Sequence, residues 1–177
     1  MQDLLEEDYR AAIEGTAHRP VVMLPFLSGE RSTNFQSGAT GALLGLTRST
    51  TRAHLVKSCL EGVTLRLAAI VRLIPSADAE IWVSGKALEV NTLWRQMIAD
   101  CTGRTVVLDS ETHEGSSRGA ACLIATSLSG QRELVEEEAT CVLKTEPRAD
   151  AKAYWSGLVQ SQESFLDAMR PIYASCS

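Results

Sequence analysis

Apolar and polar positions along the chain change between a strand-like and a helix-like period, which predicts alternating strands and helices. A short apolar run at Ile81–Val83 indicates a buried strand that ends at Ser84 and Gly85. After a loop, apolar side chains recur at helical spacing at positions Leu93, Trp94, Met97, Ile98 and Cys101. Either Asn91 or Thr92 can cap this helix, because each side-chain oxygen can accept an unpaired backbone N–H.

This strand, loop and capped helix form a layout that can hold a phosphate group. Backbone N–H groups and the dipole of the helix converge on such a loop, and both favour an anion. The same layout also occurs in many turns that bind nothing, so the pattern leaves a purely structural role open.

Three further strands and two short helices are also predicted. We expect strands over residues 21–27, 41–46 and 105–108, with Pro25 placing the first at a sheet edge or at a bend. We expect short helices over residues 3–14 and 115–129, with Gly130 just past the second. The acidic stretch 131–150 is typical of a solvated face or loop, with a short extended piece at 141–143.

Two longer helices are also predicted. The first begins after Thr50 or Thr51 and is stopped by Pro75, and its apolar stripe is Val56, Leu60, Val63, Leu67, Ile70 and Ile74. The last helix runs from about residue 151 to 169, with an apolar face of Tyr154, Leu158, Phe165, Met169 and Ile172.

Composition narrows the class of protein. The chain has 177 residues, 45% of them hydrophobic and 22% charged, which is ordinary for one globular domain. Its net charge of −5 argues against nucleic acid as a main partner, because binding phosphates needs a basic face. We expect no membrane span, since no apolar run reaches about 18 residues, and no secretory signal at the acidic start. Five scattered cysteines without a C-x-x-C pair favour a reducing, cytoplasmic setting.

Several catalytic motifs are matched only in part. Residues 115–119 fit G-x-S-x-G with Ser117 as nucleophile, but the preceding strand ends early and no histidine follows His113, which disfavours a hydrolase. His113 and Glu114 do not continue to H-E-x-x-H, and the three histidines are far apart, which disfavours zinc. The phosphate-loop pattern around Lys86 fails at Glu80 and Ala87.

Four ordered segments carry a family resemblance, which runs from about residue 23 to about residue 130. They are Gly29-Glu30-Arg31 with Asn34 and Phe35; Gly41-x-Leu43-x-Gly45-Leu46 with His54, Leu55, Ser58, Leu60 and Glu61; Ser84-Gly85 with Leu93 to Asp100; and Glu111 to Ala121. Together they resemble the C-terminal half of the FGGY carbohydrate kinases. Thr33 stands where the family usually has proline, and Cys59 where it has another small or aliphatic residue.

The resemblance implies an α/β fold. It is expected to be a partial actin-like ATPase (ribonuclease H-like) domain, with a mixed sheet, a parallel portion and packed helices. We expect one domain over residues 1–177, with a motif-bearing core at about 21–130 and a C-terminal helix at about 151–172. In that family, the small residues around Gly119 let their helix pack close to the nucleotide side.

The resemblance also implies a function, namely that of an ATP-dependent sugar or polyol kinase that uses Mg²⁺. Ser84, Gly85 and Lys86 would approach the ATP phosphates, and the segment from Asn91 to Trp94 would border the adenine pocket. The catalytic aspartate and the carbohydrate pocket would lie in an N-terminal domain outside this chain, so we assign no catalytic residue and no metal ligand within it.

One departure falls at the expected phosphate turn. Lys86 stands where the family usually has a second glycine, and the loop is about one residue longer. Lys86 either compensates as a cation or weakens nucleotide binding. Two hypotheses therefore stay open: part of a sugar kinase, as a fragment or one half of a split enzyme, or a non-catalytic half that acts as an interaction protein. The sequence leaves the sugar and homo-oligomerisation open.

Overall fold

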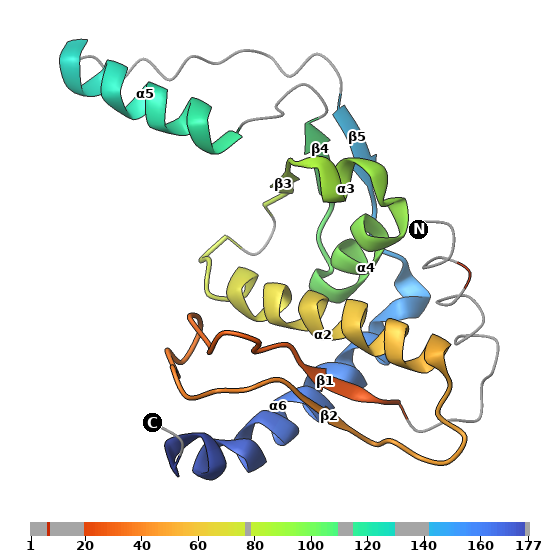
Figure 1. Ribbon diagram of the computed structural model, residues 1–177. Coiled ribbons are helices and arrows are strands. Elements are labelled where there is room, and N and C mark those ends of the chain that lie inside the picture. The colour runs from red at the N-terminus through yellow and green to blue at the C-terminus, as the bar shows by residue number, and fades with distance from the viewer. Residues whose placement is uncertain (1–6, 8–19, 77–78, 110–114, 130–141, 176–177) are drawn as a thin grey trace.

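The computed structural model of the chain describes residues 20–76, 79–109, 115–129 and 142–175, together with residue 7. The helix expected over residues 3–14 and Gly130 lie outside these residues. Strands and helices alternate as expected for an α/β chain (Figure 1). In order they are β1 (Val22–Leu24), β2 (Ala42–Leu44), α2 (Arg52–Val71), β3 (Ile81–Val83), α3 (Lys86–Val90), α4 (Thr92–Thr102), β4 (Val106–Asp109), α5 (Gly115–Ser129), β5 (Val142–Thr145), a 3₁₀ turn at Ala149–Ala151 and α6 (Lys152–Ser175).

The strands form two sheets. In the larger, β3 pairs parallel with β4, and β4 pairs antiparallel with β5, so this sheet is mixed. In the smaller, β1 and β2 form an antiparallel pair, in register at Val22 and Leu44. β1 stops just before Pro25, which has no backbone N–H to give to a ladder. Among the described strands β1 pairs with β2 alone, so the expected edge position of this strand is confirmed.

β3 is covered on one face only. Ile81 and Val83 pack against the buried Ile98 and Ala99 of α4. Trp82 points the other way and is 57% exposed. The expectation of a buried strand is therefore wrong, because the helices of the described structure cover one side of this strand.

Helix α2 lies between the β1–β2 pair and α4 (Figure 1). Thr51 caps it and forms a reciprocal capping box with His54, and the helix ends at Val71, short of Pro75. The predicted apolar stripe is right at Leu60 and Leu67, which pack against buried clusters, and wrong at Val63, Ile70 and Ile74, which are 38–53% exposed. Gly62 lies directly against Met23 of β1, and the buried face is Ser58, Glu61, Gly62, Thr64, Leu65, Ala68 and Val71.

Helix α6 closes the core from the other end of the sequence. It buries Trp155 and Leu158 against Leu65 of α2 and Met97 of α4, and it buries Phe165 against β1. The predicted face was right at its centre and wrong at its ends, where Tyr154 and Ile172 are 41% and 52% exposed. The helix also continues through Pro171 to Ser175. In the described part of the chain, no helix combines the length and apolar character needed to cross a bilayer.

Helix α5 stands away from both sheets (Figure 1). A Cβ added to Gly119 would meet no atom within 4 Å, so the expected close packing of this helix is wrong for the described structure. Its apolar side chains are unburied, at 74% exposed for Leu123, 61% for Ile124 and 83% for Leu128.

Candidate functional site

The predicted phosphate turn lies at the carboxyl end of β3. Because β3 and β4 run parallel, their carboxyl ends meet at one edge of the sheet, with Val83 opposite Leu108. Ser84 directly follows Val83, and Asp109, a carboxylate that sequence reasoning did not single out, directly follows Leu108. In open α/β sheets, ligands bind outside the carboxyl ends of the strands.

Gly85 turns the chain away from β3. Its φ is +100° and its ψ is 151°, a conformation that side chains with a Cβ rarely adopt. A Cβ built at Gly85 would meet nothing within 4 Å, so the space beside the turn is open. The turn therefore needs glycine for its backbone angle and leaves room for a group to approach.

A short helix follows where a loop was expected. Lys86–Val90 form α3, whose first turn is closed by hydrogen bonds of 3.0 Å from the N–H groups of Leu88 and Glu89 to the Gly85 carbonyl. The loop prediction is wrong because the extra residue and the run from Lys86 to Val90 allow one helical turn.

Lys86 points its charge at solvent. Its Nζ lies 3.2 and 3.3 Å from the two carboxylate oxygens of Glu89 on the same helix, and its side chain is 77% exposed. An exposed ion pair of this kind contributes only about 0–1 kcal/mol. The lysine is therefore free to exchange its partner for another anion.

Asn91 and Trp94 lie at the start of α4. Asn91 Oδ1 accepts a hydrogen bond of 2.9 Å from the Trp94 N–H, so Asn91 rather than Thr92 is the cap. The Trp94 indole Nε1 donates to Thr64 Oγ1 of α2 at 3.1 Å. Both side chains thus fix the helix start, and α3, which begins at Lys86, separates them from the turn at Ser84 and Gly85.

Arg95 was missed by sequence reasoning. It is 4% exposed, and its guanidinium donates to the backbone carbonyls of Leu88 and of Glu89, the latter at 2.9 Å. Burial lowers the pKa of Arg95 below its ordinary value. The signal was available, because Arg95 precedes the buried Ile98 and Ala99 by three and four positions and so shares their helix face.

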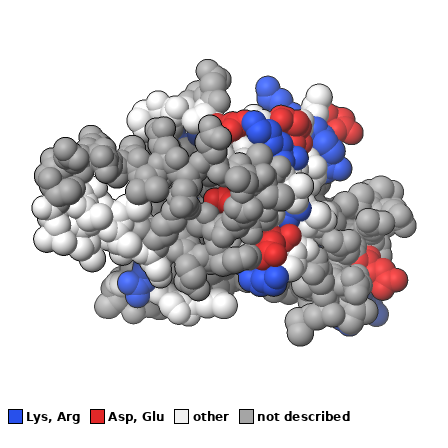
Figure 2. All heavy atoms as spheres, turned by 90° about the horizontal axis from the view of Figure 1, so that it is seen from above, with Lys and Arg blue, Asp and Glu red and all other residues white. Residues whose placement is uncertain are grey.

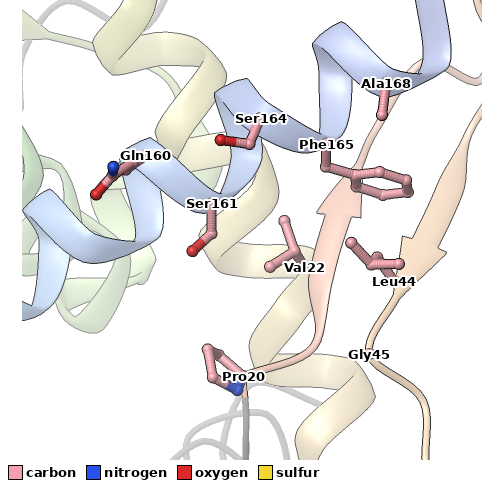
Figure 3. A pocket seen from close by; sticks show the side chains of 9 residues that line it. All are labelled: Pro20, Val22, Leu44, Gly45, Gln160, Ser161, Ser164, Phe165 and Ala168. Carbon is pink, nitrogen blue, oxygen red and sulfur yellow. The ribbon is translucent and has the colours of Figure 1, made fainter.

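A separate hollow of about 680 Å³ lies between β1, β2 and α6 (Figure 3). Ser161 Oγ, on its wall, donates to the Gly157 carbonyl of its own helix. The predicted site residues are not among those that line it, which are Pro20, Val22, Leu44, Gly45, Gln160, Ser161, Ser164, Phe165 and Ala168. Where the described surface is visible from above, acidic and basic side chains lie next to one another (Figure 2).

The mixed sheet, its covering helices and the glycine turn at the strand end define an α/β domain. The family model described as the FGGY family of carbohydrate kinases, C-terminal domain, matches residues 2–128, and the chain belongs to this family. The expected actin-like ATPase fold, as found in these kinases, is confirmed.

Individual relatives agree with this assignment. The chain is 28% identical over 176 residues to a xylulose kinase of Bacillus subtilis (94% of this chain, 34% of the relative). It is 32% identical over 111 residues to a gluconokinase of Bacillus licheniformis (60% and 21%). Its fold matches the crystal structure of gluconate kinase from Lactobacillus acidophilus with a TM-score of 0.79 at 21% identity (98% and 35%). The chain thus spans about a third or less of these proteins.

Proposed function

We propose that the chain is the C-terminal, nucleotide-binding part of an ATP-dependent kinase that transfers the γ-phosphate of ATP to a hydroxyl group of a sugar or polyol. The family match supports the kinase class, and relatives named xylulose kinase and gluconokinase support a carbohydrate acceptor. The observation that supports a nucleotide-binding site is the open glycine turn at Gly85, which lies at the carboxyl end of a parallel strand.

Each residue of the proposed site has a distinct role. The backbone at Ser84 and Gly85 approaches the phosphates, and Lys86 supplies the cation in place of a second glycine. Asn91 and Trp94 border the adenine by fixing the start of α4. ATP supplies the transferable phosphoryl group, and we propose that Mg²⁺ arrives with it, so no metal ligand and no general base are assigned to this chain.

The same proposal extends to the domain organisation, the carbohydrate-binding domain and the cellular compartment. Residues 1–177 act as one domain, because α2, α4 and α6 share one buried cluster. The carbohydrate is bound through an N-terminal domain that precedes the motif-bearing part at about 21–130. Free thiols at Cys59, Cys101 and Cys122 favour a reducing, cytoplasmic compartment.

Calorimetry with Mg-ATP and Mg-ADP tests the site. We expect Gly85→Trp to abolish binding, because the indole would fill the open space beside the turn. Gly103→Trp is the matched control, since Gly103 also has a positive φ of 68° and open surroundings but lies at the far end of α4. Equal binding by both variants would place the nucleotide elsewhere, and no binding by the folded wild-type chain would contradict a site held by this chain.

A second function is favoured by one observation. The apolar side chains of α5 at Leu123, Ile124 and Leu128 are exposed, as on surfaces that dock a partner. A non-catalytic kinase half that acts as an interaction protein would use them. Supplying an N-terminal sugar domain separates the two functions: restored sugar-dependent ATP turnover supports the kinase, whereas a folded full-length protein inactive on a broad sugar and polyol panel supports the interaction protein.

A further inference from the structure

Helix α3 has few stabilising interactions within itself. It contains five residues, none of them buried, and it directly follows the turn at Gly85. A helix of this length does not persist alone in water, because nucleation costs more than one turn of hydrogen bonds returns. Its position must therefore be set by contacts with the rest of the domain.

Arg95 supplies such a contact. Its guanidinium donates to the carbonyls of Leu88 and Glu89, which belong to the last turn of α3 and have no partner within so short a helix. The same residue belongs to α4, and its backbone N–H donates to the Asn91 carbonyl at 3.3 Å. Arg95 thus joins the end of α3 to the start of α4 at the single residue between them.

Burying the charged side chain of Arg95 at this position is energetically unfavourable. Arg95 is almost fully buried, no ion pair with a carboxylate joins it to the described residues, and its Nε lacks a hydrogen-bond partner there. A buried charge without a counter-charge lowers stability, so a well-packed apolar side chain would serve a purely structural purpose better. What the arginine supplies here is one terminal nitrogen, Nη1, held at the end of a long planar group, whose N–H bonds reach the carbonyls of both Leu88 and Glu89.

We propose that Arg95 is a positioning residue of the nucleotide site, which holds α3 and thereby sets the turn at Gly85 and Lys86. This inference rests on the proposed function, because Arg95 acts on the turn through α3 and does not itself reach it. Released carbonyls at Leu88 and Glu89 would let α3 fray, and Lys86, at its first position, would lose its fixed placement beside the turn.

The test uses the 177-residue chain with Arg95→Met, Arg95→Lys and the matched control Arg104→Met. Arg104 follows α4 at its opposite end, where its N–H donates to Thr102 Oγ1. Two quantities are measured: hydrogen exchange of the amides at residues 86–90, and the dissociation constant of Mg-ADP. In Arg95→Met we expect exchange to quicken and affinity to fall by about tenfold, the effect of losing hydrogen bonds from a charged group. Arg104→Met should stay within about twofold of wild type in both, as surface changes do.

The readouts separate the ways in which the proposal can fail. Unchanged exchange at residues 86–90 in a folded Arg95 variant overturns the role of Arg95. Faster exchange with unchanged affinity, or a lower melting temperature alone, shows a merely structural role and also overturns it. A wild-type chain that binds no nucleotide overturns the proposed function itself, while the exchange data still report whether Arg95 holds α3. If Arg95→Met does not fold, Arg95→Lys, which keeps the charge and replaces the planar guanidinium by an ammonium on a shorter side chain, provides the same two readouts.

Discussion

Gly62 of α2 lies so close to Met23 of β1 that a Cβ at Gly62 would come within 2.9 Å of both the Met23 side chain and its carbonyl oxygen. This approach is reinforced by Gln162 of α6, whose Nε2 donates to the carbonyls of Met23 at 2.8 Å and of Gly62 at 3.1 Å. Helix, strand and second helix thus meet at one point where no side chain fits.

The first prediction follows from this contact. Gly62→Ala should lower the free energy of unfolding by about 1–3 kcal/mol, because overpacking outweighs the gain in helix propensity. Gly157→Ala in α6 is the matched control, since a Cβ there meets nothing within 4 Å, and it should raise stability by about 0.5–1 kcal/mol. Urea denaturation measures both, and two changes of the same sign would contradict the packing described here.

The second prediction concerns Asp100, whose fully buried carboxylate joins α4 to the segment after β5. It accepts hydrogen bonds from the Arg148 backbone N–H at 2.7 Å, from the Arg148 guanidinium at 2.6 and 2.9 Å, and from Gln96 at 2.9 Å. Asp100→Ala should cost about 2 kcal/mol of unfolding free energy, because these donors lose a buried acceptor. Asp167→Ala, which removes an exposed pair with Arg170, should change it by less than about 0.5 kcal/mol.

The third prediction is a pH dependence of stability. Burial raises the pKa of Glu61 above its ordinary value of 4.5, and the ion pair with Lys57 at 2.8 Å and the hydrogen bond from Tyr154 at 2.5 Å only partly oppose this. The folded chain therefore keeps a proton on Glu61 at pH values where the unfolded chain has lost it. Stability should fall as the pH rises from 4.5 through the raised pKa.

Urea denaturation at a series of pH values checks this dependence. Glu61→Gln removes the titrating group, so its unfolding free energy should show a smaller decrease over that range. Glu163→Gln, at an exposed pair with Arg72, is the control and should keep the wild-type slope. A wild-type slope of the opposite sign in this range, absent from Glu61→Gln, would contradict the direction of the pKa shift.

The fourth prediction concerns the charge at the proposed phosphate turn. Lys86→Gln should weaken Mg-ADP binding and Glu89→Gln should strengthen it, each by about two- to fivefold, because one removes the cation and the other its competing carboxylate. Both effects should shrink at high salt, which screens exposed charges. Calorimetry at two salt concentrations measures them. Stronger binding by Lys86→Gly would show instead that the lysine closes the site.

Sequence reasoning located the elements well where the signal was local. The cap at Asn91, offered together with Thr92, and the cap at Thr51, offered together with Thr50, each depend on a few adjacent residues, and each is found in the structure. The family resemblance was carried by four such local segments, and it too is confirmed.

Sequence reasoning failed where the burial or role of a residue depends on contacts with a segment elsewhere in the chain. The buried face of α2 is chosen by how closely β1 approaches, which turns Gly62 and Thr64 inward and leaves Val63 and Ile70 outside. At the candidate site, Gly85 could be read from the sequence, whereas the role of Arg95 depends on carbonyls that become neighbours only when α3 forms. The roles assigned to Ser84, Gly85, Lys86, Asn91 and Trp94 in binding a nucleotide stay predictions.

The family match ends at residue 128, but the buried core does not. β1 packs its inner face on Phe165 and Leu166, and Tyr173 Oη donates to the Thr40 carbonyl at 2.8 Å. The first strand described and the last helix are thus partners across almost the whole length of the chain. During synthesis, β1 leaves the ribosome long before α6, so the part of the core that these two elements share assembles only after the last helix has been made.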